Sequence, residues 1–349
     1  MSQKHLFIFN STSILKRFIL RLTVFVFPIA ALLILSIVFY IFTDPFEVVW
    51  RYDTHLNSTS DYQITTNRDF KSTQLFLLNY KKNNYDSFIL GNSRSLFYQI
   101  ESWNKYIKGN GFHFDASNES LYGVDCKLRL LSGLDVKIKN VLIVLDTGLL
   151  RQVKNSEGHL FVKHPMLSKE SYLTFHYKMF RGFFPNAVIA YADLFFNGKK
   201  KYMLKYGIMD TIWEHDSKTN QLKLDLYDHQ IKTNPGLYYS DKINDFHKRA
   251  VFTVYSEPVI QTQQERLLKN INTLLKIHKT NFKIIISPLY DQVKINKRDL
   301  NYLKNLFGSE NVYDFSGINK ITSDYHNYYE TSHYRPVVCD SILKIIYTK

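Results

Sequence analysis

The sequence predicts an α/β fold with a central parallel sheet, preceded by one apolar segment long enough to cross a membrane. Three observations support this prediction: 22 consecutive uncharged residues between Arg21 and Asp44, an alternation of short apolar runs with helical patterns from Tyr85 onward, and a polar turn directly after the first of those runs. The chain has 349 residues, of which 45% are hydrophobic and 22% charged. It can therefore bury a core, and its length suits two domains or one domain with a large insertion.

The apolar run at residues 22–43 predicts a transmembrane anchor. A helix of this length rises about 30 Å, which is the thickness of the hydrocarbon core of a bilayer. Pro28 lies within the run, and proline is tolerated in such helices. The run is longer than the apolar region of a signal peptide, about 7–15 residues, and no small-residue cleavage site precedes Asp44. We therefore expect the anchor to stay uncleaved.

Charges on either side of the run predict its orientation. The first 43 residues carry a net charge of +4 and no acidic residue, whereas Asp44 and Glu47 follow the run directly. The positive-inside rule then places a basic tail, residues 1–21, in the cytoplasm and everything after the anchor outside the cytoplasmic membrane, in a periplasm or at the cell surface.

The net charge of the whole chain is +14, which favours anionic surroundings such as phospholipid headgroups or acidic glycans. The basic residues are spread along the chain, as they also are on an ordinary solvated surface. Nucleic acid is disfavoured as a partner by the predicted compartment. The two cysteines, Cys126 and Cys339, exclude a disulfide scaffold, and both a disulfide between them and two buried thiols remain open.

Apolar runs and helical patterns alternate from Tyr85 to the end of the chain, apart from residues 150–258. Runs typical of buried strands occupy residues 87–90, 111–116, 141–146, 282–286 and 312–315. Helical patterns occupy residues 94–106, 120–134, 259–278, 299–307 and 335–347. This alternation predicts a flavodoxin-like three-layer α/β/α sandwich built from residues 85–149 and 259–349, with residues 44–84 as a polar connector.

Residues 150–258 do not follow this alternation, and we expect a large insertion after the third strand. It contains many aromatic residues, then the basic run Lys199–Lys201, then a hairpin-like stretch at Trp213–Leu226. An insertion at this point leaves the carboxyl edge of the sheet, where α/β proteins bind ligands. A lid, a substrate-binding surface and a membrane-facing surface all fit it, and so does a small aromatic core of its own.

Ser93 is the candidate nucleophile. The strand at residues 87–90 runs into a Gly-Asn-Ser turn and then into a predicted helix, so Ser93 is expected at the carboxyl edge of the sheet beside free N–H groups of that helix. The alternative is that Ser93 only caps the helix, because serine is among the best N-cap residues.

Glu330 and His333 are the candidate partners of Ser93. They lie in the stretch YYETSHYRP, after the last predicted strand and before the last helix, and so belong to the same edge of the sheet. A carboxylate three residues before a histidine can hold one ring nitrogen while the other faces a serine. The stretch predicts a triad of nucleophile Ser93, general base His333 and orienting Glu330, although a histidine on a loop is often only a surface residue.

The order of four sequence blocks resembles the SGNH (GDSL-like) hydrolase superfamily. The blocks are GNSR after the first strand, FDASNESLYG, the apolar strand ending in Asp146, and ETSHYRP before the last helix. More narrowly they resemble its membrane-anchored bacterial branch, which is associated with cell-surface polysaccharide acylation. The resemblance covers most of residues 85–149 and 259–349, and it implies the same roles for Ser93, His333 and Glu330.

Two blocks depart from the superfamily pattern at the expected oxyanion donors. FDASNESLYG has no glycine before Gly123, and the third strand ends LDTGLL without the usual asparagine. Asn118 or Glu119 occupies the position of one donor. The Asn118 side chain, with the Ser93 N–H, could bind the oxyanion, and it could equally cap the following helix. Loss of one such donor costs about 10²- to 10³-fold in rate.

The leading functional hypothesis is an extracytoplasmic serine esterase or O-acyltransferase acting on an acylated glycan or another ester of the cell envelope. No cofactor or metal is expected, because the sequence has no HExxH or comparable ligand spacing and no glycine-rich phosphate loop. One alternative is a catalytically inactive module that binds a glycan or a partner, such as a multi-spanning membrane acyltransferase, in a polysaccharide-modification complex. Another is a lipid esterase at the membrane surface.

Overall fold

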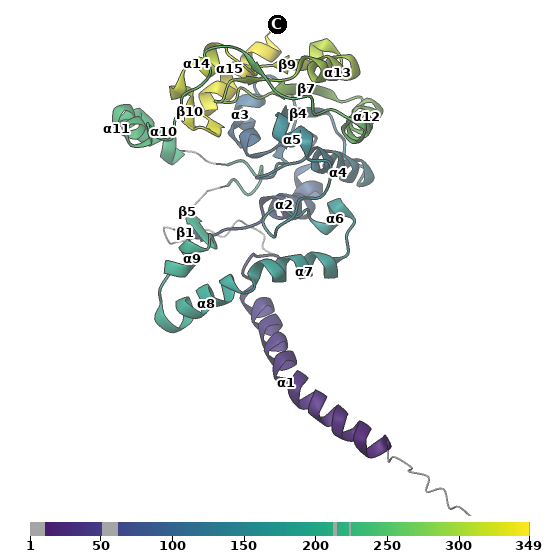
Figure 1. Cartoon of the computed structure of the whole chain (residues 1–349). Coiled ribbons are helices and arrows are strands. Elements are labelled where there is room, and N and C mark those ends of the chain that lie inside the picture. Colours follow the sequence, from purple (N-terminus) through teal and green to yellow (C-terminus); the bar gives the residue numbers. More distant parts are fainter. Residues whose placement is uncertain (1–10, 51–61, 212–214, 223–224, 349) are drawn as a thin grey trace, which may run out of the picture.

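The computed structural model describes residues 11–50, 62–211, 215–222 and 225–348. A long helix, α1 (Ser11–Thr43), projects from the rest of the chain, and the C-terminus lies at the opposite end of the molecule (Figure 1). Among the described residues, α1 is the one helix long and apolar enough to span a membrane, over Ile14–Thr43. The predicted apolar helix is confirmed, and it begins earlier than residue 22.

A parallel sheet of five strands forms the centre of the α/β domain. Its order is β3-β2-β4-β7-β9, and every neighbouring pair is parallel. The predicted central parallel sheet is therefore confirmed. The strands are β2 (Ser87–Gly91), β3 (Gly111–His113), β4 (Asn140–Leu145), β7 (Asn281–Ile286) and β9 (Val312–Asp314).

Helices cover both faces of the sheet. Successive residues of a strand point to opposite faces, so alternate residues of one strand pack against different helices. Phe88 and Leu90 belong to one hydrophobic cluster, and Ile89 between them belongs to another. Helices that contribute to the first cluster are α2 (Arg68–Asn83), α4 (Leu121–Gly133), α12 (Thr262–Ile277) and α13 (Lys297–Phe307). Helices that contribute to the second include α3 (Ile100–Trp103) and α15 (Pro336–Tyr347), with two further helices from residues 225–242.

The segment 44–84, expected to be a polar connector, contains part of the core. Its helix α2 begins after the N-cap Asn67 and buries Leu75 and Phe76 against the sheet. Most residues of its first two turns are polar yet buried, and its exposed lysines lie in the last turn, so the composition of the segment looked like that of a linker.

The insertion is divided between two places in the molecule. The part of its first half from residue 172 onward packs on the end of α1, and the residues before it contribute Leu150 and Leu167 to the cluster with α4. Its second half packs beside the C-terminal part of the domain. The first half consists of α5 (Thr147–Arg151), α6 (Pro165–Ser168), α7 (Tyr172–Phe183), α8 (Asn186–Asn197), α9 (Lys201–Lys205) and β5 (Met209–Thr211), the last paired with β1 (Tyr62–Ile64). The second half consists of α10 (Asp225–Thr233), α11 (Pro235–Lys242) and β6 (Val254–Tyr255).

Short elements complete the chain. They are η1 (Ser93–Phe97), β8 (Val293–Lys294), η2 (Ser309–Asn311), α14 (Lys320–Ser323), η3 (Tyr325–Asn327), β10 (Tyr328–Glu330) and β11 (His333–Tyr334). The hairpin-like stretch Trp213–Leu226 lies partly outside the described residues. Within it, an antiparallel bridge joins His215 to Leu222.

Both cysteines are buried free thiols on opposite faces of the sheet. Cys126 lies in the cluster with α4, and Cys339 lies in the cluster with α15. Burial raises the pKa of Cys126 to about 11 and holds the pKa of Cys339 well above its usual value. Of the two alternatives, a disulfide or two buried thiols, the structure shows buried thiols, which are unreactive.

Four fully buried charges connect α2, α4, the β3–α4 loop and the insertion. The Nζ of Lys163 donates to Asp69 at 2.9 Å and to Glu119 at 2.5 Å, and the Nζ of Lys127 lies 3.0 Å from Asp69 and 2.5 Å from Glu119. A Cβ on Gly123 would lie 2.0 Å from Glu119 Oε1, so only glycine fits beside this group. We call these four residues the buried charge ring.

The ring keeps Asp69 and Lys163 ionised. Burial alone would lower the pKa of Lys163, but the negative charges of Asp69 and Glu119 raise it above its usual value. Burial would likewise raise the pKa of Asp69, but Lys127 and Lys163 lower it. Removal of one cation therefore leaves an excess buried negative charge, which is the costly case for a buried ion pair.

We expect Lys163→Met to lower the free energy of unfolding by about 3–5 kcal/mol, since it breaks two buried ion pairs. The measurement is denaturant unfolding of the detergent-solubilised chain. Lys178→Met is the matched control, because Lys178 forms a half-exposed ion pair with Glu170, and its loss should cost about 0–1 kcal/mol. Equal losses in the two variants would contradict the role given to the ring.

Candidate active site

The turn after β2 presents Ser93 at the carboxyl edge of the sheet. Gly91 is required there, because a Cβ would lie 2.8 Å from the Val144 carbonyl oxygen of the neighbouring strand. Asn92 is the N-cap of η1, and its side-chain oxygen accepts the Arg94 N–H. Ser93 is the first residue of η1 and is half-buried. The capping role that was the alternative for Ser93 thus belongs to Asn92.

Glu330 and His333 face each other across a short hairpin. Strands β10 and β11 are antiparallel, and Glu330 is paired with His333 across a two-residue turn. The Ser332 N–H in this turn donates to Glu330 Oε2 at 2.6 Å. A hairpin, rather than the expected loop, therefore fixes the carboxylate beside the imidazole.

The structure brings Ser93, His333 and Glu330 into one hydrogen-bonded chain. His333 Nε2 lies 2.9 Å from Ser93 Oγ, and His333 Nδ1 contacts Glu330 Oε1. An ionised carboxylate only accepts hydrogen bonds, so Nδ1 carries the proton. In the neutral imidazole Nε2 is then the acceptor, and the Ser93 hydroxyl donates to it. This tautomer is the one that can take a proton from serine.

The surroundings of Glu330 favour its ionised form. Burial alone would raise the pKa of Glu330, but the hydrogen bond to His333, the charge of that imidazole, the Ser332 N–H and nearby Lys242 together hold it below its usual value. Glu330 therefore stays a carboxylate at neutral pH and can stabilise a protonated His333.

Arg94 connects three segments of the site and was not singled out by the sequence analysis. Its Nη1 donates to Asp146 at the end of β4 at 2.8 Å, and its Nε donates to the Ser332 carbonyl at 3.2 Å. The nucleophile turn, β4 and the histidine hairpin are thus held by one guanidinium. Two features of the sequence could have indicated a role for Arg94: it directly follows Ser93, and an acidic residue ends the third strand.

The expected oxyanion donors are arranged differently from the prediction. Asn118 is exposed, and its side-chain oxygen accepts from Gln152 Nε2 at 3.0 Å. The Ser93 N–H points to the Ser117 carbonyl at 3.3 Å. Asn118 therefore lies in the loop next to Ser93, but neither it nor the Ser93 N–H is held as a preformed donor.

Asp146 stands at the end of β4, where the superfamily pattern has an asparagine nearby. Its Oδ2 accepts from Asn92 Nδ2 at 2.6 Å and from Arg94, and its Oδ1 accepts the Leu149 N–H at 2.9 Å. The carboxylate is thus neutralised by Arg94 and caps α5, which makes it a structural support of the nucleophile turn.

The second half of the insertion packs directly on the histidine hairpin. Tyr238 Oη donates to the Tyr329 carbonyl at 3.1 Å, and Tyr239 Oη donates to the Tyr328 carbonyl at 3.0 Å. An ion pair between Arg335 and Asp228 joins α10 to the residue after the hairpin. Helices α10 and α11 therefore support the backbone on either side of Glu330, a role that the aromatic pattern alone did not predict.

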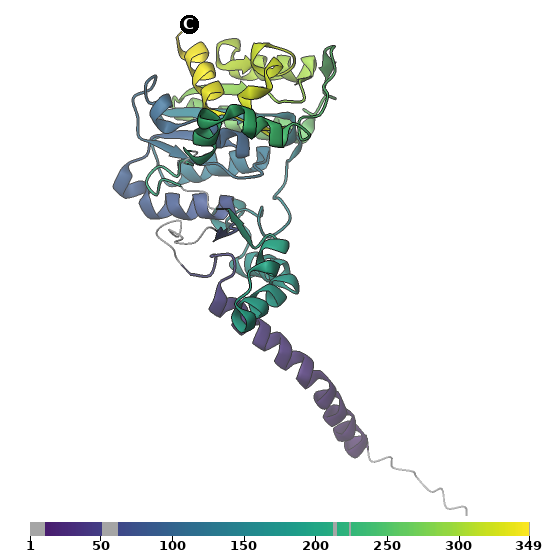
Figure 2. The same cartoon turned by 90° about the vertical axis from the view of Figure 1, so that its left-hand side faces the viewer.

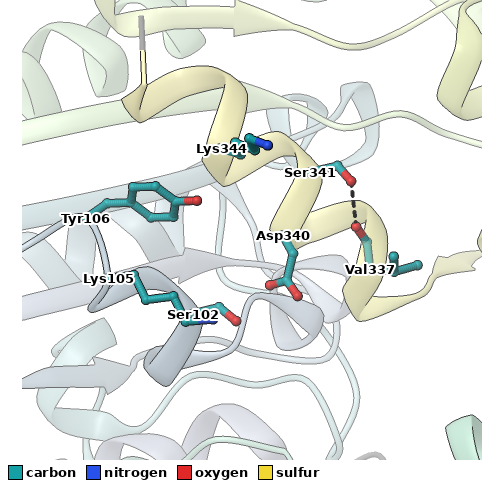
Figure 3. Close-up of a pocket in the computed structure, with 7 residues that line it drawn as sticks. All are labelled: Ser102, Lys105, Tyr106, Val337, Asp340, Ser341 and Lys344. Carbon is teal, nitrogen blue, oxygen red and sulfur yellow. Dashed lines mark hydrogen bonds between the residues drawn. The ribbon is translucent and has the colours of Figure 1, made fainter.

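A cavity of about 260 Å³ lies elsewhere, between α3 and α15 (Figure 3). Lys105, Tyr106, Asp340 and Lys344 are among its lining residues, and Ser341 donates to the Val337 carbonyl at its rim. None of the triad residues lines it. Among the residues that the structure describes, no group of three or more His, Cys, Asp or Glu side chains could hold a metal ion.

The lowered pKa of Glu330 predicts a pH-dependent stability. Its folded-state pKa is below the unfolded value of about 4.3, so ionised Glu330 stabilises the fold above that pH and the contribution is lost as the pH falls through the folded-state pKa. We expect the parent to melt at a higher temperature than Glu330→Gln at about pH 7, and the difference to shrink as the pH falls below the unfolded-state pKa. Glu257→Gln, at an exposed position, should match the parent throughout. A pH-independent difference for Glu330→Gln would contradict this.

Loss of Arg94 should loosen the site without unfolding it. We expect Arg94→Met to lower the rate constant for reaction of Ser93 with a fluorophosphonate by about 10- to 100-fold, because small displacements of reacting groups are costly. Arg94→Lys should not restore the rate, since one ammonium cannot reproduce the forked contacts to Asp146 and Ser332. Arg151→Met on the exposed face of α5 is the control; if Arg94→Met reacts as fast as this control, the assignment fails.

The sequence matches no protein-family model and no curated protein, so the chain is described by its fold and site alone.

Proposed function

We propose that the protein is a serine esterase or O-acyltransferase of the SGNH (GDSL-like) type that acts outside the cytoplasmic membrane on an acylated glycan of the cell envelope. The observation that carries the proposal is the chain from Ser93 Oγ through His333, at 2.9 Å, to Glu330. Ser93 lies just after β2, and Glu330 and His333 lie in a hairpin some 240 residues later. Together they form the arrangement that nucleophilic acyl transfer needs.

The topology supports the same superfamily. Numbered along the chain from β2, the strands of the sheet follow the order 2-1-3-4-5, which is that of flavodoxin-like doubly wound folds. With helices on both faces, this supports a three-layer α/β/α sandwich. The turns after β2 and β4 then lie at the carboxyl edge where such folds bind ligands, and Ser93 is on one of them.

In the first half of the proposed reaction, Ser93 Oγ attacks the carbonyl carbon of the ester while His333 Nε2 takes the hydroxyl proton. The tetrahedral oxyanion collapses as the bond to the alcohol oxygen breaks, and protonated His333 gives its proton to that oxygen. The products are the free alcohol and an acyl group esterified to Ser93. Glu330 stabilises the imidazolium during both proton transfers.

In the second half, His333 takes a proton from water or from a sugar hydroxyl, whose oxygen attacks the acyl-serine. Collapse of the second intermediate returns the proton to Ser93 Oγ. Water gives a carboxylic acid and makes the protein an esterase, and a sugar hydroxyl gives a new ester and makes it an O-acyltransferase. Acceptor access to the half-exposed Ser93 decides between the two outcomes.

The proposed location follows from α1. Its apolar span, preceded by basic residues and followed by Asp44 and Glu47, supports a single-pass anchor with the N-terminus in the cytoplasm and the α/β domain outside. A multi-spanning membrane acyltransferase that supplies acyl groups is a fitting partner for a domain anchored in this way.

The arrangement around the oxyanion position favours a second candidate, a non-catalytic glycan- or partner-binding module. The Ser93 N–H is directed to a carbonyl, Asn118 is turned to Gln152, and a carboxylate ends β4. A missing donor lowers the rate by about 10²- to 10³-fold, so these contacts weigh against efficient turnover unless the loop at 115–120 moves on binding.

Fluorophosphonate labelling of the full-length chain distinguishes the two candidates. We expect one adduct by intact mass, absent in Ser93→Ala and in His333→Ala, and ester turnover reduced about 10⁴-fold or more in both variants. Ser341→Ala and His278→Ala, remote from the triad, should keep the parent's labelling. A folded parent that takes no adduct would reject the catalytic proposal and favour the binding module.

A further inference from the structure

We propose that α7 and α8 lie in the outer headgroup region of the bilayer that α1 spans, so that an interfacial helix pair holds the domain on the membrane in addition to the anchor. This inference rests on the proposed anchoring by α1. It assigns the part of the insertion that contains α7 and α8 to lipid, and it does not depend on whether Ser93 is catalytic.

The helix pair is packed on the last turns of α1. The Tyr40 ring lies 5.7 Å from the rings of Phe180 and Phe183, and the Phe39 ring lies 6.3 Å from Tyr191. These residues belong to a cluster that also buries Phe175 and Met179 of α7. In both views α7 and α8 lie beside the C-terminal end of α1, between it and the α/β domain (Figures 1 and 2).

The position of this contact along α1 fixes its depth. About 20 helical residues cross the hydrocarbon core, and counting from Arg21 they end near Ile41. Tyr40 is therefore at the outer boundary, and helices in contact with it lie at the level of the headgroups. Trp50 is exposed at the same end, and its Nε1 donates to the Ile41 carbonyl. Tyrosine and tryptophan are the residues enriched at this boundary.

The face of the pair turned away from the cluster is apolar and exposed. Leu173 on α7 is 82% exposed, and Phe195 and Phe196 at the end of α8 are 81% and 79% exposed. Tyr177 and Phe184 are also more than half exposed. On α7 the exposed residues recur at intervals of four and seven and so share one face of the helix, and at the end of α8 the Phe195 and Phe196 rings lie 5.2 Å apart. Exposed apolar side chains grouped in this way indicate a partner.

The charges next to this face favour lipid as the partner. The exposed lysines Lys199–Lys201 begin three residues after Phe196, and Lys205 follows on α9. Bulky apolar side chains beside lysines are typical of helices that lie in the interface of an anionic membrane. The two helices that carry these side chains also pack directly on the end of α1, and this contact with the proposed anchor favours the bilayer over a separate protein.

Spin labels attached to single introduced cysteines test the depth of this surface in the full-length chain. The parent's Cys126 and Cys339 are buried, so only the introduced thiol should react. The variants are Phe195→Cys and Leu173→Cys in the proposed interface, Leu32→Cys at an exposed position within α1, and Val251→Cys, which is 94% exposed on the domain. Each is reconstituted in vesicles of phosphatidylcholine and phosphatidylglycerol, and collisions with oxygen and with a water-soluble nickel chelate are compared.

We expect the oxygen-to-nickel collision ratio at positions 195 and 173 to exceed that at 251 several-fold, and to lie between the ratios at 251 and 32. A ratio at 195 and 173 equal to that at 251, with 32 in lipid, would overturn this inference and leave the anchor intact. Protection from both reagents would also overturn it and assign the face to protein, with spin–spin broadening indicating a second copy. A water-like ratio at 32 would reject the anchoring itself.

Discussion

The loop beside Ser93 depends on two lysines and two carboxylates buried together. Asp69 comes from α2, Glu119 from the β3–α4 loop, Lys127 from α4 and Lys163 from the insertion, so no two members share an element. As a set they carry no net charge, and each alone would be expensive to bury. The ring therefore requires all four segments to be in place at once, and it couples the insertion to the active-site loop.

The sequence predicted the parts of the fold that are set by local patterns. Continuous apolar runs predicted the strands of the sheet, because a parallel strand covered on both faces has no polar side. The candidate triad was also found locally, since Ser93 follows the first strand directly and Glu330 lies three residues before His333. Two strand ends at one edge of a parallel sheet then suffice to bring these groups together.

What the sequence did not predict depends on contacts between distant segments. Helix α2 looked like a connector because most of its residues are polar, and several of these, Asp69 among them, are buried through contacts with distant segments. The support of the histidine hairpin by Tyr238 and Tyr239 uses carbonyl groups, which leave no trace in the sequence. The place of Arg94 directly after Ser93 was a signal in the sequence, but its contacts with Asp146 and the Ser332 carbonyl join segments that are distant along the chain.

The firm junction between α1 and the domain has a consequence for which substrates are within reach. An enzyme on a flexible tether samples a broad range of heights above the membrane, and its effective concentration is spread over that range of heights. Here aromatic packing on Tyr40 and the buried ion pair of Lys71 with Glu47 join helix and domain directly. Under the proposed anchoring, Ser93 is carried at one height above the lipid, and glycan chains would be selected by how far along their length the acylated sugar lies.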